Sequence, residues 1–298
     1  MYKRQGVHLR FSYPTTGDAY LVLDGYTDMS EIKIDPAKRQ ISGWVNNQRF
    51  VNDSKSFRNY FVVQFDKPFE DYGVWENQKD EVFPQKLDGA GKGYGAFIKF
   101  KKGSKVQAKA ASSYISAEQA LITLNKELGK DKNLEVTKAR GQKTWNEVLN
   151  RIVVEGCTDE QMKTFYSCLF RANLFSRKFY ERKENGEPYY YSPYNGKIYD
   201  GYMYTDNGFW DTFRSQFPLT NILHPTMQGR YMNALLAAQE QCGWLPSWSS
   251  PGETGGMLGN HSISLLADAW AKGIRDFDPE KALKAYCLLY TSDAADEL

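Results

Sequence analysis

The period of the hydrophobic residues changes near Ser116, and this change restricts the fold more than any other feature of the sequence. Before Ser116 the chain consists of short β-branched and aromatic runs, several of which alternate apolar and polar residues as half-buried strands do. After Ser116 apolar residues recur at helical spacing. The sequence therefore predicts an α+β chain with several domains, in which a sheet region precedes a helical region.

Five runs between Gly6 and Ser116 have the character of strands. They are VHLRFSY, AYLVLDGY, NYFVVQFD, YGAFIKFK and KVQAKAASSY. Glycine-rich segments such as GAGKGYG indicate turns between them. Because no helical period of useful length occurs in this region, an antiparallel sandwich is the simplest arrangement. We assign residues 6–115 to part of an N-terminal antiparallel β-sandwich domain.

Two capping boxes mark helix starts from Ser116 onwards. SAEQ has the Ser-x-x-Gln form and opens a helix that closes at Gly129, and TDEQ at residues 158–161 has the Thr-x-x-Gln form. The first box opens a stretch of helices that connects the sheet region to the main helical region. We assign residues 116–157 to linker helices on this basis.

Two Asn-Gly pairs, at residues 185–186 and 195–196, predict hairpin turns. After them, helices are expected over approximately 208–223, 227–241, 260–273 and 279–286. Helices joined by short and long aromatic loops in alternation fit an α/α toroid, although an irregular bundle has the same periodicity. We assign residues 158–286 to this partial helical domain.

Aromatic residues make up 15% of the chain, and this excess over what a core needs favours surfaces on which ligands stack. A net charge of +2 gives no electrostatic case for nucleic acid as a partner. No apolar run approaches the ~20 residues of a membrane span. The 4 cysteines and 3 histidines are widely spaced, so they predict neither a disulfide framework nor a His-rich zinc site.

The two ends of the sequence resemble translated adaptor DNA. Met1–Gln5 can be encoded by GTG-TAT-AAG-AGA-CAG, and the reverse complement of that DNA, read from its second base, encodes Cys-Leu-Leu-Tyr-Thr, which stands at residues 287–291. One inverted adaptor accounts for both ends. We therefore expect residues 1–5 and 287–298 to be artefacts, and the genuine sequence to run from residue 6 to residue 286 of a longer gene.

Two loops of the helical region combine aromatic rings with hydrogen-bonding groups. The first is GYMYTDNGFWDTFR, at residues 201–214, and its candidate site residues are Trp210, Asp211 and Arg214. The second is GWLPSWSSPGETGGMLGNHS, at residues 243–262, and its candidates are Trp248, Glu253, Asn260 and His261. Rings stack on the apolar face of a sugar, and carboxylates, amides and imidazoles bond its hydroxyls. Both loops are therefore candidates for a carbohydrate site.

Several residues of these loops also have a structural interpretation. Asp211 and Arg214, three residues apart, can form an exposed ion pair worth roughly a few tenths of a kcal/mol. The Asp206-Asn207-Gly208 segment is more typical of a turn and helix cap than of a ligand site. His261 at a helix start is more typical of a structural donor than of a catalyst. A glycosidase needs two carboxylates, and Asp211 and Glu253 are the candidates by type.

Extended blocks of the sequence resemble glycoside hydrolase family 92, the calcium-dependent exo-acting α-mannosidases. They are ASSYISAEQALITLNKELG, FYSCLFRANLFSRKFYE, YYYSPYNGKIYDGYMYTDNGFWDTFRSQFPL, GWLPSWSSPGETGGMLGNHS and ADAWAKGI. The resemblance implies a β-sandwich followed by an (α/α)6 toroid, and hydrolysis of terminal α-mannosides of glycans with inversion. It implies that Asp211 contacts the sugar in the −1 subsite. It also implies a bacterial protein of the periplasm or cell surface, with calcium as cofactor.

The family's catalytic blocks do not occur in this sequence. Its acid lies in a later Glu-Gly-Asn-x-Trp-Gln-Tyr-like block and its base in a later Gly-Asn-Asp-Asp-x-Gly-like block. We therefore assign no catalytic residue and no metal ligand, and we expect the chain alone to be inactive. A non-catalytic glycan-binding protein on the same fold is the main alternative, and a lyase or glucosidase on an α/α toroid is a third.

Overall fold

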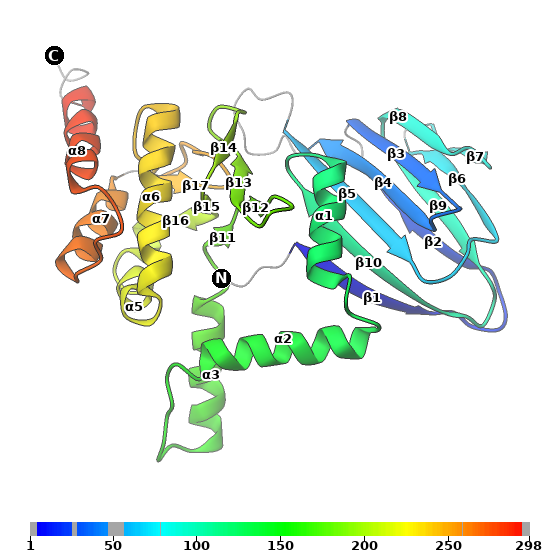
Figure 1. Ribbon diagram of the computed structural model, residues 1–298, viewed down its shortest axis with the longest axis horizontal. Coiled ribbons are helices and arrows are strands. Elements are labelled where there is room, and N and C mark those ends of the chain that lie inside the picture. Colours follow the sequence, from blue (N-terminus) through cyan, green and yellow to red (C-terminus); the bar gives the residue numbers. More distant parts are fainter. Residues whose placement is uncertain (1–4, 26–28, 47–56, 78, 258, 294–298) are drawn as a thin grey trace. The chain divides into compact units, whose positions relative to one another are not determined.

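A computed structural model describes residues 5–25, 29–46, 57–77, 79–257 and 259–293 (Figure 1). These residues form two compact units. The β unit comprises the described residues up to Trp145, and the helical unit comprises the described residues from Asn146. The division falls inside a helix, so the chain passes from one unit to the other without a loop.

The β unit contains two antiparallel sheets. Sheet A has the strand order β1-β10-β5-β4-β3-β8, and sheet B has the order β2-β9-β6-β7. The bounds of these strands are β1 (Gly6–Ser12), β2 (Ala19–Leu23), β3 (Met29–Asp35), β4 (Gln40–Asn46), β5 (Arg58–Phe65), β6 (Asp71–Glu76), β7 (Glu81–Pro84), β8 (Asp88–Lys92), β9 (Tyr94–Phe100) and β10 (Lys105–Ser113).

The two sheets pack face to face over one apolar core, as a sandwich requires. Ile32 and Ile41 of sheet A and Ile98 of sheet B belong to the same buried cluster. Along β9 the core-facing Ala96, Ile98 and Phe100 are buried, whereas Phe97 and Lys99 between them are partly exposed. The expected β-sandwich is therefore confirmed.

All five strands predicted from the sequence are present, as β1, β2, β5, β9 and β10. The turn predicted over GAGKGYG is wrong for most of that segment, because Gly89–Lys92 belong to strand β8 and pair with β3. Glycine is needed there for space. A Cβ on Gly89 would lie 2.3 Å from Cδ1 of Tyr94, so the aromatic ring occupies the place of a side chain.

Helix α1 (Ala117–Leu128) belongs to the β unit. Its predicted N-cap is confirmed, since the Ser116 hydroxyl accepts a hydrogen bond from the Gln119 amide at 3.1 Å. Leu124 lies in the apolar contact that α1 makes with β5 and β10. Helix α2 (Leu134–Leu149) follows, and the division between the units falls within it.

The helical unit contains α3 (Asp159–Ala172), α4 (Phe209–Thr212), α5 (Gln216–Leu223), α6 (Pro225–Cys242), α7 (His261–Ala271) and α8 (Pro279–Asp293). Each of the helices α5 to α8 packs against the next one in the chain, and α5 also contacts α7 and α6 also contacts α8 (Figure 1). This succession agrees with part of an α/α toroid. Within the described ranges, no helix is both long and apolar enough to cross a membrane.

One predicted helix, 208–223, is wrong as a continuous element, because residues 213–215 form a turn between α4 and α5. The side-chain amide of Gln216 donates to the carbonyls of Ala172 at 3.1 Å and Phe175 at 2.6 Å. These bonds fix the start of α5 against the end of α3, independently of α4. The other predicted helices agree with the structure to within a few residues at their starts.

Short strands occupy the segments between α3 and α7. They are β11 (Arg177–Lys178), β12 (Glu181–Arg182), β13 (Pro188–Tyr191), β14 (Ile198–Asp200), β15 (Tyr204–Thr205), β16 (Asn207–Gly208) and β17 (Trp248–Ser249). The two Asn-Gly hairpins are confirmed, joining β12 to β13 and β13 to β14. Gly186 and Gly196 supply the left-handed conformation, with φ of 93° and 72°.

Candidate functional site

A two-residue antiparallel ladder brings the two candidate loops together. Asn207 of β16 pairs with Ser249 of β17, and Gly208 pairs with Trp248. The buried Asn207 amide donates to the Ser176 hydroxyl at 2.7 Å. The segment before α4 therefore lies against the loop that follows α6, and Asn207 is fixed to a buried polar partner.

A cavity of about 420 Å³ opens beside this ladder, within the range of small-molecule pockets. Its lining residues are Phe175, Asp206, Asn207, Gly208, Asp211, Thr212, Gln216, Trp248 and Ser250. Two sequence-derived candidates, Asp211 and Trp248, therefore share one cavity. A Cβ on Gly208 would lie 3.2 Å from Oδ2 of Asp211 and 3.4 Å from Cδ2 of Trp248, so this glycine leaves room between carboxylate and indole.

Asp206 is a second carboxylate of the cavity, and the sequence reasoning missed it as a site residue. Its Oδ2 lies 2.5 Å from Nε of Arg177, while its buried Oδ1 has no hydrogen-bond partner in the part of the chain that the structure describes. Its φ of 59° is uncommon for a residue other than glycine. The helix cap expected at Asp206-Asn207-Gly208 is present, since Gly208 is the N-cap of α4, but all three residues also line the cavity. The aromatic residues on both sides of this segment were the signal in the sequence that could have indicated a site.

Trp210, Arg214 and His261 gather in a cluster of rings that does not line the cavity. Phe213 stacks on the His261 imidazole with ring centroids 4.4 Å apart, and Trp210 meets the same imidazole edge-on at 5.0 Å. The Arg214 guanidinium carbon lies 5.1 Å from the centre of the Phe213 ring. His261 Nε2 is buried and has no hydrogen-bond partner among the described residues. The imidazole is therefore held by ring contacts.

The ion-pair interpretation of Asp211 and Arg214 is wrong. The ion pairs formed within the described ranges do not include one between these two side chains. Arg214 lies beyond the last residue of α4, so the two are not on one regular helix. Asp211 is exposed, and its carboxylate remains available to a ligand in the cavity.

Glu253 supports its own loop. Its Oε2 accepts hydrogen bonds from the backbone amides of Ser247 at 2.6 Å and Trp248 at 3.4 Å. Its Oε1 accepts from the Ser247 hydroxyl and the Gly255 amide, each at 2.9 Å. Asn260, another candidate, accepts a hydrogen bond from the Ser262 hydroxyl at 3.0 Å. Glu253 therefore fixes the backbone that presents Trp248 to the cavity, without lining the cavity itself.

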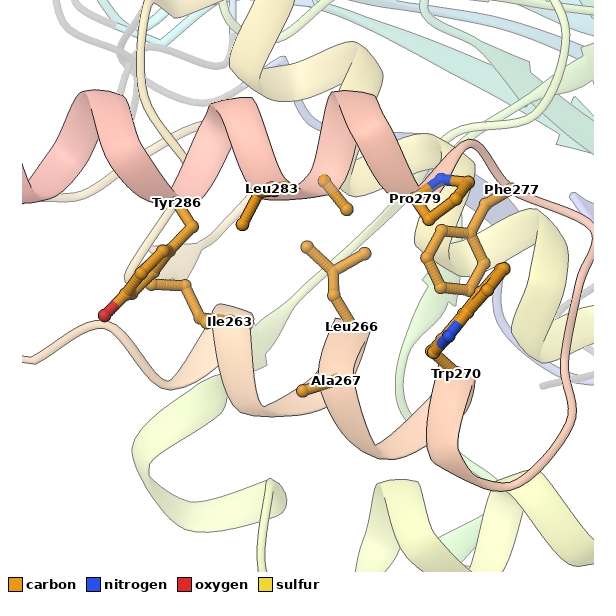
Figure 2. A pocket seen from close by; sticks show the side chains of 9 residues that line it. Ile263, Leu266, Ala267, Trp270, Phe277, Pro279, Leu283 and Tyr286 are labelled. Carbon is orange, nitrogen blue, oxygen red and sulfur yellow. The ribbon is translucent and has the colours of Figure 1, made fainter.

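A further cavity, of about 290 Å³, lies between α7 and α8 and is apolar. Figure 2 shows Leu266 of α7 and Leu283 of α8 pointing into it from opposite sides, with Trp270 beside Phe277 at its end. Apart from the Trp270 indole and the Tyr286 phenol, its lining side chains are carbon only. A sugar needs several hydrogen-bonding partners, so the cavity of Asp211 suits a sugar better.

The residues in hand do not form a calcium site by themselves. Within the described ranges, no group of three or more His, Cys, Asp or Glu side chains lies together as metal ligands would. Calcium takes six to eight oxygen ligands, and the cavity offers the carboxylates of Asp206 and Asp211. We therefore assign no step to a metal.

Two sheets packed as a sandwich precede helices whose connecting segments line a cavity with an indole and carboxylates, and such a lining suits a carbohydrate-active protein. Residues 3–113 match the glycosyl hydrolase family 92 N-terminal domain, and residues 119–295 match the glycosyl hydrolase family 92 catalytic domain. The chain belongs to glycoside hydrolase family 92.

Solved structures of this family are similar to the chain over almost its whole length. The family GH92 inverting mannosidase of Bacteroides thetaiotaomicron VPI-5482 is 44% identical with a TM-score of 0.89, and the match covers 94% of this chain and 38% of that one. A family GH92 α-mannosidase of Bacteroides thetaiotaomicron shares the fold at 23% identity and a TM-score of 0.83, covering 95% of this chain and 39% of that one. It has also been solved with mannoimidazole. No curated protein matches the chain significantly.

Proposed function

We propose that this chain is part of an exo-acting α-mannosidase that removes terminal mannose from mannose-containing glycans with inversion of configuration. One observation carries the proposal: Asp211 and Trp248 share a cavity in a chain that is 44% identical to an inverting mannosidase. The chain spans 38% of the length of that relative, so the activity is proposed for the longer protein.

The residues of the cavity suit the binding of a pyranose. The Trp248 indole offers a flat apolar surface on which the carbon face of the sugar stacks. Asp211 accepts hydrogen bonds from sugar hydroxyls, and the Arg177 contact fixes the orientation of Asp206. These side chains therefore bind and orient the sugar.

Inverting hydrolysis also needs an acid and a base, whose carboxyl groups stand ~6.5–9.5 Å apart so that a water fits between sugar and base. We propose that these two groups, and most calcium ligands, belong to the later family blocks that this sequence does not contain. A periplasmic or cell-surface location in a bacterium is part of the same proposal.

The test uses the longest open reading frame that contains this sequence. Its product is incubated with α-1,2-, α-1,3- and α-1,6-mannobiosides in the presence of calcium, and NMR identifies the anomer released first, which is β-mannose for an inverting enzyme. We expect Asp211→Ala to lower kcat/KM at least about 100-fold, which is ~3 kcal/mol of transition-state stabilisation. Lys281→Gln is the control, since Lys281 pairs with Glu240 and does not line the cavity.

The possible results separate the candidate functions. Unchanged kinetics in Asp211→Ala would remove this residue from the site. Mannoside binding without hydrolysis would favour the non-catalytic glycan-binding protein. Unsaturated or glucose products from other substrates would favour a lyase or glucosidase on the same kind of toroid.

A further inference from the structure

A second polar cavity lies in the helical unit, at the start of α6. It has a volume of about 190 Å³, and its lining includes three cationic side chains, Arg151, Lys178 and Arg230. No carboxylate of the described residues lines it, and it shares no lining residue with the cavity of Asp211. The lining therefore contains cationic side chains and no carboxylate of the described residues.

Two of the cations make contacts that leave their charge uncompensated. The Arg230 guanidinium carbon lies 4.5 Å from the centre of the Tyr202 ring, and the ion pairs of the described residues do not include this arginine. Arg151 donates a hydrogen bond to the Leu223 carbonyl at the end of α5. A ring face or a carbonyl attracts a cation but does not neutralise it. An anion in the cavity would provide the missing charge.

Buried phenols add donors to the same lining. Tyr204 is 4% exposed, and its hydroxyl makes no hydrogen bond of good geometry with any described residue. Its polar neighbour is the Tyr180 hydroxyl, and burial raises the pKa of both phenols, so both keep their protons at neutral pH. Within a pair of hydroxyls only one O–H can donate to the other. One of the two protons is therefore left without an acceptor among the described residues.

The first turn of α6 contributes the positive end of an 18-residue helix. Pro225 has no amide hydrogen, and the amides of Met227 and Gln228 bond to the His224 carbonyl at 3.1 and 3.0 Å. Thr226 lines the cavity in this turn, and its backbone amide precedes the first amide that bonds to the His224 carbonyl. Burial, together with Arg151, lowers the pKa of His224 to about 4, so this imidazole is neutral at pH 7.

We propose that this cavity binds a tetrahedral oxyanion, phosphate or sulfate, either free or as the ester group of a sugar. Arg230 and Lys178 would provide charge-assisted hydrogen bonds, and the Tyr204 hydroxyl and the first turn of α6 would provide neutral ones. A neutral sugar fits less well, because its hydroxyls also need acceptors such as carboxylates. An oxyanion presents acceptors on every side, and the lining consists largely of donors. This site is separate from the proposed mannosidase function.

The test is calorimetric titration of the 298-residue chain with inorganic phosphate, at constant ionic strength set with sodium chloride. We expect saturable phosphate binding that chloride at the same ionic strength does not reproduce. Arg230→Gln should weaken it at least about tenfold, and Tyr204→Phe about three- to tenfold, the range of one hydrogen bond. Lys281→Gln removes the same charge outside the cavity and should leave phosphate binding unchanged.

Two results would overturn the proposal. One is that the unsubstituted chain binds phosphate no better than chloride at the same ionic strength. This result can be interpreted without any variant. The other is an equal loss in Arg230→Gln and Lys281→Gln when circular dichroism shows both folded. A hexose 6-phosphate that binds more tightly than inorganic phosphate would identify the sugar ester as the ligand, whereas equal affinity would identify the free oxyanion. Unchanged phosphate binding in Asp211→Ala would keep this site distinct from the sugar cavity.

Discussion

Replacing Glu253 by glutamine tests whether this carboxylate supports its loop or reacts with substrate. In the structure its two oxygens accept from four donors, among them the backbone amides of Ser247 and Gly255 on opposite oxygens. Glutamine keeps one acceptor oxygen. In either orientation its amide nitrogen would therefore face a backbone N–H, donor against donor.

The size of the effect follows from these contacts. A donor left facing a donor costs about 1–3 kcal/mol, and the loss of charge weakens the remaining bonds further. Because Glu253 is half-buried, water relieves part of the mismatch. We expect Glu253→Gln to lower the free energy of unfolding by about 2 kcal/mol and the melting temperature by about 4–8 °C. Ser247→Ala, which removes only the hydroxyl bond, should lower the free energy by about 1 kcal/mol.

The assay combines thermal unfolding with kinetics of the longer protein on mannobiosides. Since Glu253 positions the backbone of Trp248, we expect KM to rise in Glu253→Gln, with kcat falling less than about tenfold. A catalytic acid would give the reverse result: an unchanged melting temperature and a kcat that falls by several orders of magnitude. That outcome would refute the loop role and make Glu253 the acid.

Three further substitutions test the fold and the cavity. Gly208→Ala is compatible with the backbone, whose φ is −91°, but its methyl group would contact Asp211 and Trp248. The affinity of the longer protein for mannosides should therefore fall roughly tenfold, with little change in melting temperature. The lowered pKa of His224, about 4 against 6.5, gives stability that is full above pH 6.5 and is lost as the pH falls towards 4. In urea unfolding of His224→Gln, the free energy of unfolding should therefore change by roughly 2 kcal/mol less over this pH range than in the unsubstituted protein. The same dependence of this free energy on pH in both proteins would contradict the prediction. Leu124→Ala should lower the free energy of unfolding in urea by about 3 kcal/mol, since Leu124 is 1% exposed. Leu121→Ala should lower it by less, since Leu121 is only partly buried.

Helix starts and hairpins could be predicted because they depend on residues a few positions apart. Thr158 and Gln161 exchange the two hydrogen bonds of the capping box, at 3.0 and 3.3 Å. Both Asn-Gly turns need only a glycine that tolerates positive φ. Such local features can be predicted from the sequence because they do not depend on tertiary contacts.

Strands whose pattern is set by distant partners escaped prediction. Ser30 of β3 is fully buried, and its hydroxyl is satisfied by the Tyr94 carbonyl at 2.9 Å, a residue of another strand. At Gly89 of β8 the same Tyr94 ring occupies the space that a side chain would need, so only glycine fits there. A polar residue and a glycine indicate a turn in the sequence alone, and only tertiary packing shows them to be parts of a sheet.

The site shows the same division between local and non-local chemistry. Residue type alone identified Asp211 and Trp248 as candidates for a sugar site, but their shared cavity depends on the pairing of β16 with β17. Glu253 was a candidate of the correct type, and its actual partners are backbone amides of its own loop. No residue pattern distinguishes a carboxylate that holds a loop from one that faces a ligand.

The shortness of the β16–β17 ladder also determines how the cavity can move. Two paired residues contribute little to stability, so separating the ladder should require far less free energy than unfolding α5 or α6. Amide hydrogens of Gly208 and Ser249 are then expected to exchange with solvent through local openings, faster than those at the centre of α6. A ligand that contacts both Asp211 and Trp248 would stabilise the closed form, and its measured affinity would include the free energy of closing the cavity.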